Sequence, residues 1–260
     1  MKLFACMCNH PQRLPAALAP VRAALLAAPP VARWGLSYVQ SGDVLLVRTP
    51  KVSEIEVDLA APLAEIKSDC AIGHAVRDTT YSGTDNTPPF RFRRWMFSQT
   101  GTPNLGDAVP RLLEHIPEYL RRNIRGRTPG ELFFHLFLAM LHDEGNIEDP
   151  NLSTAAQRRA LAATLKLVGA ELERVGSADK LGNLAVSNGR SMVLARVSEP
   201  LRLRRLSVTG ERGEKDESFR GVLLISGGDG DAKDGFEDVP PQTAVLITRD
   251  LQVSFADLAP

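Results

Sequence analysis

Cysteine is scarce in this chain of 260 residues. Cys6, Cys8 and Cys70 are odd in number, and their spacing matches no zinc motif. The sequence therefore suggests neither a disulfide framework nor a cysteine-based metal site, and reduced thiols are typical of a cytoplasmic protein. Cys6 and Cys8 stand two apart in an apolar stretch, so we expect them on one face of a strand as core residues.

Net charge is absent as well. The chain has 31 basic and 31 acidic residues, which removes any global electrostatic attraction to nucleic acid or to an anionic membrane. The basic runs Arg91–Arg94, Arg121–Arg127 and Arg202–Arg205 could still form a surface that contacts phosphates. In a neutral chain we favour solvated faces over such a surface.

Long hydrophobic runs are also missing. The apolar run after Lys2 has six residues before Asn9, which is too short for a secretory signal. The Ala-rich stretch Pro15–Ala32 contains Arg22 and four prolines, which argues against a membrane span. We therefore expect a soluble, cytoplasmic protein. With 43% hydrophobic residues, we expect one domain over residues 1–260.

Periodicity and turn signals predict strands, then helices, then strands. The predicted strands are Leu3–Cys8, Trp34–Val39, Val44–Arg48, Cys70–Arg77, Phe92–Ser98, Asn183–Ser187, Met192–Val197, Leu201–Val208, Gly221–Ile225 and Ala244–Thr248. The predicted helices are Leu14–Ala27, Val57–Ile66, Thr128–His142 and Thr154–Val175. Thr128, Pro129 and Glu131 form a helix start with an N-cap and a capping-box acid. This order fits a layered α+β domain better than alternating βαβ units.

Several short segments keep a recognisable order and spacing. They are Leu3-Phe4-Ala5, Trp34-Gly35-Leu36, Ala75-Val76-Arg77, Asn86-Thr87-Pro88-Pro89-Phe90, Gln99-Thr100-Gly101, Gly126–Glu131, Asn183–Arg190 and Val239–Asp250. In this order they resemble class II glutamine amidotransferases, whose catalytic domain is an N-terminal nucleophile hydrolase. In that family the segment at Trp34 reads Gly-Trp-Gly-Ile, and the segment at Ala75 reads His-x-Arg. The segment at Asn86 reads Asn-Thr-His-Pro-Phe, and the segment at Gln99 reads His-Asn-Gly. The resemblance implies a four-layer αββα sandwich.

The chemical positions of that family are altered. The resemblance places Lys2 where the family has its catalytic N-terminal cysteine, and a lysine offers no ready nucleophile there. Its long stem is expected to crowd the substrate amide. The oxyanion hole falls on Thr100, which lacks the amide NH2 of asparagine, and on Gly101, which keeps its backbone N–H. The arginine and aspartate that hold the substrate fall on Arg77 and Pro129.

Two histidines of the family are missing too. Ala75 and Pro88 stand in their places, and His74 lies one residue before Ala75, so in a strand it points to the opposite face. Arg77 has an alternative interpretation, an ion pair with Asp78 or Asp85. His135 and His142 lie seven apart on one predicted helix with no third ligand, so we read them as structural.

Three functional hypotheses follow, in order of preference. The first is a catalytically inactive amidotransferase-like domain, a pseudoenzyme that binds a partner protein or a small carboxylate or other anionic ligand through Arg77, Thr100 and Gly101. The second is an active glutamine amidohydrolase with Cys6 as nucleophile after removal of residues 1–5. The third is a nucleic-acid-associated module that uses the arginine runs. The first hypothesis predicts no catalytic residue, no metal ligand and no cofactor.

Overall fold

Two antiparallel sheets form the middle of the molecule. The computed structural model describes residues 2–209, 214–227 and 235–258. Within these residues the first sheet has the strand order β13-β11-β12-β1-β6-β3-β4, and the second has the order β15-β14-β10-β9-β8-β7. The strands of the first sheet are β1 (Lys2–Cys8), β3 (Arg33–Gln40), β4 (Asp43–Thr49), β6 (Cys70–Val76), β11 (Leu201–Leu206), β12 (Gly221–Ser226) and β13 (Glu237–Asp238). Those of the second are β7 (Phe90–Phe92), β8 (Trp95–Gln99), β9 (Leu184–Ser187), β10 (Met192–Arg196), β14 (Thr243–Ile247) and β15 (Val253–Asp257).

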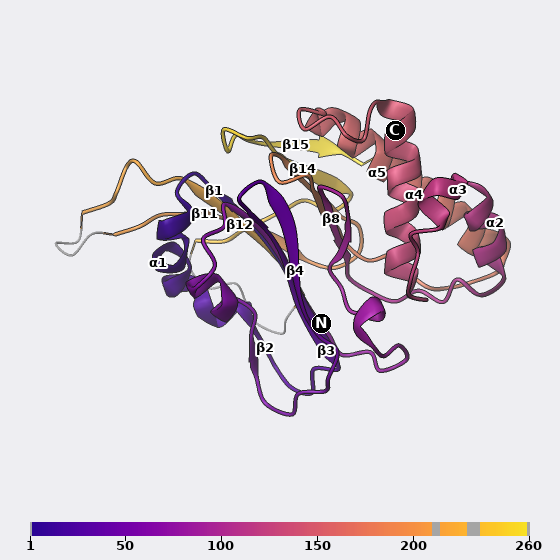
Figure 1. Cartoon of the computed structure of the whole chain (residues 1–260), viewed down its shortest axis with the longest axis horizontal. Coiled ribbons are helices and arrows are strands. Elements are labelled where there is room, and N and C mark those ends of the chain that lie inside the picture. Colours follow the sequence, from indigo (N-terminus) through magenta and orange to yellow (C-terminus); the bar gives the residue numbers. More distant parts are fainter. Residues whose placement is uncertain (1, 210–213, 228–234, 259–260) are drawn as a thin grey trace.

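Helices cover the outer face of each sheet. The second sheet packs against α2 (Val109–Glu114), α3 (Glu118–Arg121), α4 (Pro129–Glu144) and α5 (Thr154–Arg174). The first sheet packs against α1 (Leu14–Leu18) and the 3-10 turns η1 (Pro11–Arg13), η2 (Ala19–Leu25) and η3 (Ala61–Ala64). Figure 1 shows α4 and α5 on one side of the sheets and α1 on the other. The predicted four-layer αββα sandwich is therefore confirmed, as a single domain.

Strand β1 shows how the layers are filled. Leu3, Ala5 and Met7 pack between the two sheets. Phe4, Cys6 and Cys8 point the other way, into the core beneath α1. Because successive side chains of a strand alternate between its faces, an almost continuous apolar run is what a strand buried on both faces requires.

The predicted start of helix α4 is also confirmed. The Thr128 hydroxyl accepts a hydrogen bond from the backbone N–H of Glu131 at 3.3 Å, and Pro129 is the first helical residue. The Glu131 carboxylate does not complete a capping box, because it accepts from the backbone N–H groups of Arg125 at 3.0 Å and Gly126 at 2.6 Å. Glu131 therefore ties the preceding loop to the helix.

Other predicted elements are wrong. In place of a helix over 14–27 the chain forms the five-residue α1, then η2 and the short strand β2 (Leu26–Ala27), because Pro20 lacks the N–H that a continuing α-helix needs. In place of a helix over 57–66 it forms strand β5 (Val57–Asp58), paired with β2, and then η3. The predicted strand 92–98 is a hairpin of β7 and β8 that turns at Arg93, whose φ is +54°.

Among the described residues, no helix has the length and apolar character that a membrane crossing requires.

Candidate functional site

The start of β1 lies among the residues to which the resemblance assigns chemistry. Because β1 and β6 are antiparallel, Lys2 pairs with Ala75 and Leu3 with His74. The ring Nδ1 of His74 lies 2.7 Å from the Ser98 hydroxyl of β8, so one hydrogen bond joins the two sheets at this end. Thr100 and Gly101 follow directly after β8. The candidate site is therefore the end of the sandwich that contains Lys2, His74, Ser98 and the turn at Thr100.

His74 is the buried polar centre of this end. Its side chain is 1% exposed, and its Nε2 has no hydrogen-bond partner among the described residues. Burial, reinforced by the positive charge of Arg33, lowers the pKa of His74 to about 3. Ala75 packs into the core beneath α1, whereas His74 reaches the other sheet, so the predicted opposite orientation of these neighbours is confirmed.

Lys2 points away from the space between the sheets. Its ammonium Nζ donates to the carbonyl of Ala24 at 2.9 Å, and Ala24 belongs to η2 on the outer face of the first sheet. This is the face on which Phe4 and Cys6 are buried. The expectation that the lysine stem crowds a substrate amide beside Thr100 is therefore wrong, because the stem extends into the outer layer.

Thr100 is hydrogen-bonded to Asn183, the residue directly before β9. Its backbone N–H donates to the Asn183 carbonyl at 2.8 Å, and its hydroxyl accepts from the Asn183 N–H at 2.9 Å. A Cβ on Gly182 would stand 1.5 Å from the Thr100 carbonyl oxygen, so only glycine allows this approach. Gly101 has a φ of +78°, as the predicted tight exit from the strand requires. The Thr100 hydroxyl thus serves the backbone of this turn.

Arg77 is exposed at the end of β6. Its Nη2 donates to the carbonyl of Ala28 at 3.4 Å. The alternative ion pairs with Asp78 or Asp85 do not form among the described residues; the Asp78 carboxylate instead accepts from the N–H and hydroxyl of Thr80, at 2.8 and 2.6 Å. Burial alone would raise the pKa of Asp78, but hydrogen bonds from Thr80 and Thr102 outweigh it and lower that pKa. Thr102 follows Gly101, so this contact brings the loop after Arg77 to the predicted turn.

Sequence reasoning missed Arg33. This arginine is 3% exposed and donates to the carbonyls of Asn86 at 2.9 Å and Tyr81 at 2.7 Å, and also to that of Asp78. Burial lowers its pKa. Arg33 holds the loop between β6 and β7 against the first strand of the β3–β4 hairpin. The available signal was a charged residue directly before the Trp34-Gly35 motif.

Gln99 is a second polar residue that sequence reasoning missed. It stands where the family has histidine, is 4% exposed, and neither atom of its amide has a partner among the described residues. Its Oε1 lies 3.9 Å from where a Cβ on Gly130 would stand, so the side chain points toward the first turn of α4. Pro129, at the position where the resemblance places a substrate-binding aspartate, begins that same turn. Gln99 therefore places a buried amide beside the first turn of α4.

All three thiols are buried. Cys6 is 0% exposed, and burial raises its pKa well above the usual value. Burial raises the pKa values of Cys8 and Cys70 to about 12. Cys6 and Cys8 share one face of β1, which confirms their prediction as core residues. None of these thiols is poised to become a thiolate at neutral pH.

The two helix histidines and the arginine runs have local partners. His135 Nδ1 donates to the Glu131 carbonyl at 2.9 Å, and the His142 ring lies 6.2 Å from that of Tyr119. No group of three or more potential ligand side chains is placed to hold a metal within the described residues. Ion pairs within the runs include Arg93 with Glu148, Arg122 with Glu118, and Arg202 with Asp238. Each run lies on a different element, which favours separate solvated faces.

Comparison with solved structures identifies the fold. The chain superimposes over 100% of both chains on a glutamine aminotransferase class-II domain protein from Silicibacter pomeroyi, with a TM-score of 0.64 and 18% identity. A predicted glutamine amidotransferase from Pseudomonas aeruginosa matches with a TM-score of 0.54 and 14% identity, over 97% of this chain and 99% of the other. The glutamine phosphoribosylpyrophosphate amidotransferase of B. subtilis also matches, with a TM-score of 0.56 and 12% identity. The match covers 100% of this chain and 49% of the B. subtilis chain.

Sequence comparison adds no closer relative: no family model and no curated protein matches the chain. The structural identities are all below one fifth, so the likeness concerns architecture. The chain has the N-terminal nucleophile hydrolase fold that these class II glutamine amidotransferase domains share.

Proposed function

We propose that this chain is a class II glutamine amidotransferase-like protein that does not hydrolyse glutamine and acts by binding a partner protein or a small anionic ligand. The observation that carries the proposal is the orientation of Lys2. A nucleophile that works with an oxyanion hole at Thr100 and Gly101, on the second sheet, has to face the space between the sheets. Position 2 faces the outer layer, and its ammonium is bound to the Ala24 carbonyl at 2.9 Å.

Ser98 and His74 do not supply a substitute for the missing thiol. Their 2.7 Å contact resembles a nucleophile and its base, but both side chains are buried, with 0% and 1% exposure. With a pKa of about 3, His74 is a poor general base at neutral pH. This pair is better explained as a link between the sheets.

Cys6 is an equally poor nucleophile. Its register partners are Ala71 on one side and Leu223 on the other, in the middle of the first sheet. Removal of residues 1–5 would delete the buried Leu3 and Phe4, whose burial contributes about 3 to 6 kcal/mol, comparable with the stability of a whole domain. A chain that begins at Cys6 is therefore expected to be unstable.

Binding is supported by the groups that remain at this end. Arg77 is exposed, and within the described part of the chain its guanidinium has one contact, to the Ala28 carbonyl at 3.4 Å, so it is available to a carboxylate or another anion. The buried amide of Gln99 lacks partners within the described residues. These features favour a recognition role for the candidate site over a hydrolytic one.

The test is glutamine turnover by the purified full chain. We expect no ammonia release above background and no labelling by a glutamine-analogue electrophile, with an active glutaminase as positive control. Intact mass should show that Lys2 is retained. Turnover that disappears in Cys6→Ser but persists in Cys8→Ser would instead establish an amidohydrolase that uses Cys6 after removal of residues 1–5. Cys8→Ser is the matched control because both thiols lie on one face of β1. Turnover that disappears only in Ser98→Ala would assign the chemistry to the pair with His74.

A further inference from the structure

A pocket opens at the opposite end of the sandwich. It has a volume of about 410 Å³ and lies between the β3–β4 turn at Ser41, the segment before β6 at Asp69, and three turns of the second sheet. His74 lies at the far end of β6, four residues beyond Cys70, where that strand begins. At about 3.3 Å per residue the pocket lies on the order of 15 to 20 Å from the candidate site.

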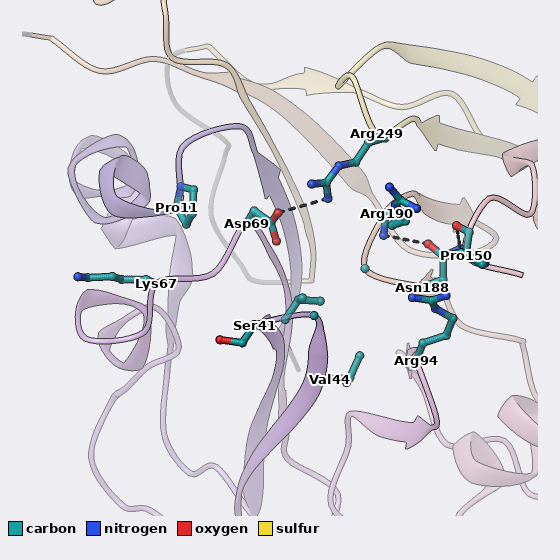
Figure 2. A pocket seen from close by; sticks show the side chains of 13 residues that line it. Pro11, Ser41, Val44, Lys67, Asp69, Arg94, Pro150, Asn188, Arg190 and Arg249 are labelled. Atoms are coloured by element: carbon teal, nitrogen blue, oxygen red, sulfur yellow. Dashed lines mark hydrogen bonds and ion pairs between the residues drawn. The ribbon is translucent and has the colours of Figure 1, made fainter. Parts of the chain in front are cut away.

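Three arginines reach this pocket from three hairpins. Arg94 lies in the turn between β7 and β8, Arg190 lies between β9 and β10, and Arg249 lies between β14 and β15. Figure 2 shows the three on one side of the pocket, with Asp69 across from them and Lys67 pointing away. Hairpin turns at one end of an antiparallel sheet lie side by side, so the sheet itself gathers these charges.

Negative charge in the pocket does not balance them. Asp69 is the one carboxylate among the described lining residues, and its Oδ2 lies 3.3 Å from Arg249 Nη1. Arg190 donates to the amide oxygen of Asn151 at 3.1 Å, a neutral partner. Arg94 makes a 3.4 Å contact with the Glu148 carbonyl, and its Nε is buried without a partner among the described residues. The wall thus carries cationic groups that a bound anion would satisfy.

Hydrogen bonds and close packing hold the turn that presents Arg190. The Asn188 side-chain oxygen accepts from the N–H groups of Arg190 at 2.9 Å and Ser191 at 3.0 Å. The Asn188 amide also donates to the Pro150 carbonyl at 3.1 Å. Gly189 has a φ of +81°, and a Cβ there would stand 2.8 Å from Val39, so this turn packs closely against the first sheet. A preorganised turn loses little freedom when a ligand binds.

We propose that this pocket is a binding site for a small molecule that bears a phosphate group. A planar carboxylate fits one or two guanidinium forks, whereas a tetrahedral phosphate with two charges presents oxygens to donors that arrive from several directions. The volume of about 410 Å³ is in the range of small-molecule sites. The site is separate from the one that contains Lys2 and His74, so the proposal stands whether or not the chain hydrolyses glutamine.

The experiment is calorimetric titration of the full chain at constant ionic strength. The probes are inorganic phosphate, glycerol 3-phosphate and, as a dicarboxylate, succinate. We expect both phosphates to bind and succinate to bind at least about tenfold more weakly, with Arg190→Gln and Arg249→Gln each weakening phosphate about tenfold. Arg174→Gln, on the exposed end of α5, is the matched control and should leave the affinity unchanged.

Asp69→Asn gives a result of the opposite sign. Removing the one opposing carboxylate should tighten phosphate binding by about threefold or more, which a loss of folding could not imitate. If glycerol 3-phosphate bound more strongly than inorganic phosphate, the ligand class would be a phosphorylated metabolite. If the two bound equally, the ligand would be the free phosphate ion. Three outcomes would overturn the proposal. They are no binding of any probe at roughly 10 mM, binding of succinate as strong as that of phosphate, and phosphate binding that Arg190→Gln leaves unchanged.

Discussion

Mild acid should destabilise this protein through His74. The ring is buried between the sheets, and its Nδ1 contacts the Ser98 hydroxyl at 2.7 Å. The folded chain holds the pKa of His74 at about 3, against an ordinary value of 6.5. A histidine with a depressed pKa stabilises the fold fully above the unfolded pKa. That stability declines as the pH falls from about 6.5 toward 3.

The size of the effect follows from the two pKa values. At pH 5 the unfolded histidine is almost fully protonated and the folded one is almost neutral, so the loss relative to pH 7.5 is about 2 kcal/mol. Burial also lowers the pKa of His135, which adds a loss of the same sign. Burial raises the pKa of Glu131, which acts in the opposite direction. The contribution of His74 is therefore isolated by comparing pH slopes between variants.

Urea unfolding at several pH values between 7.5 and 5 measures these slopes. His74→Asn should lower stability at pH 7.5, because asparagine leaves part of the site empty, and should flatten the decline by about 2 kcal/mol. His142→Asn, at an exposed position, should keep the wild-type slope. An NMR titration should show the His74 ring neutral down to about pH 4. If the stability of His74→Asn declined with falling pH as steeply as that of the wild type, or if the His74 ring titrated near pH 6.5, the buried inter-sheet contact would be refuted.

Two further variants test the geometry of the site. Lys2→Cys alone, with the initiator methionine removed, should show no glutaminase activity in an ammonia assay. The reason is that position 2 faces η2 and that the Thr100 hydroxyl accepts a hydrogen bond from the Asn183 N–H. Robust turnover would contradict this orientation of position 2. Gly182→Ala should lower the free energy of unfolding by about 3 kcal/mol, since the new Cβ meets the Thr100 carbonyl at 1.5 Å. The control is Gly169→Ala in α5, where an added Cβ would meet nothing within 4 Å, and it should raise the free energy of unfolding by roughly 0.5 to 1 kcal/mol. If the two substitutions changed the free energy of unfolding equally in a urea titration, the close packing at Thr100 would be refuted.

Local signals explain which elements could be predicted. The start of α4 follows from Thr128 and Pro129, and the β3–β4 hairpin follows from Ser41-Gly42 between two apolar runs. The segments over 14–27 and 57–66 were misread because their structure depends on a distant pairing. Leu26 meets Asp58 across β2 and β5, and no pattern within either segment indicates that partner. Tertiary context overrides weak helical propensity there.

The candidate site could be predicted only in part, for a related reason. The strand Leu3–Cys8 and the shared face of Cys6 and Cys8 were predicted correctly, but the direction of Lys2 was not. Which of the two faces meets the second sheet is decided by packing, and the structure assigns it to Leu3 and Ala5. The contacts of Arg33 with residues 45 to 53 positions away are likewise invisible to a local pattern.

The residues at the positions to which the resemblance assigns chemistry each have a structural role in this chain. The ammonium of Lys2 satisfies the Ala24 carbonyl, the Thr100 hydroxyl accepts the Asn183 N–H, and Pro129 begins α4. Placing cysteine, asparagine and aspartate at these positions would remove all three contributions, so the proposed loss of hydrolysis would coincide with a gain in stability at this end of the fold. The layers beneath remain held by apolar burial that involves none of these side chains. A fold stabilised in this way can lose its chemistry and keep its architecture, and its hairpin turns at the other end are free to carry a different site.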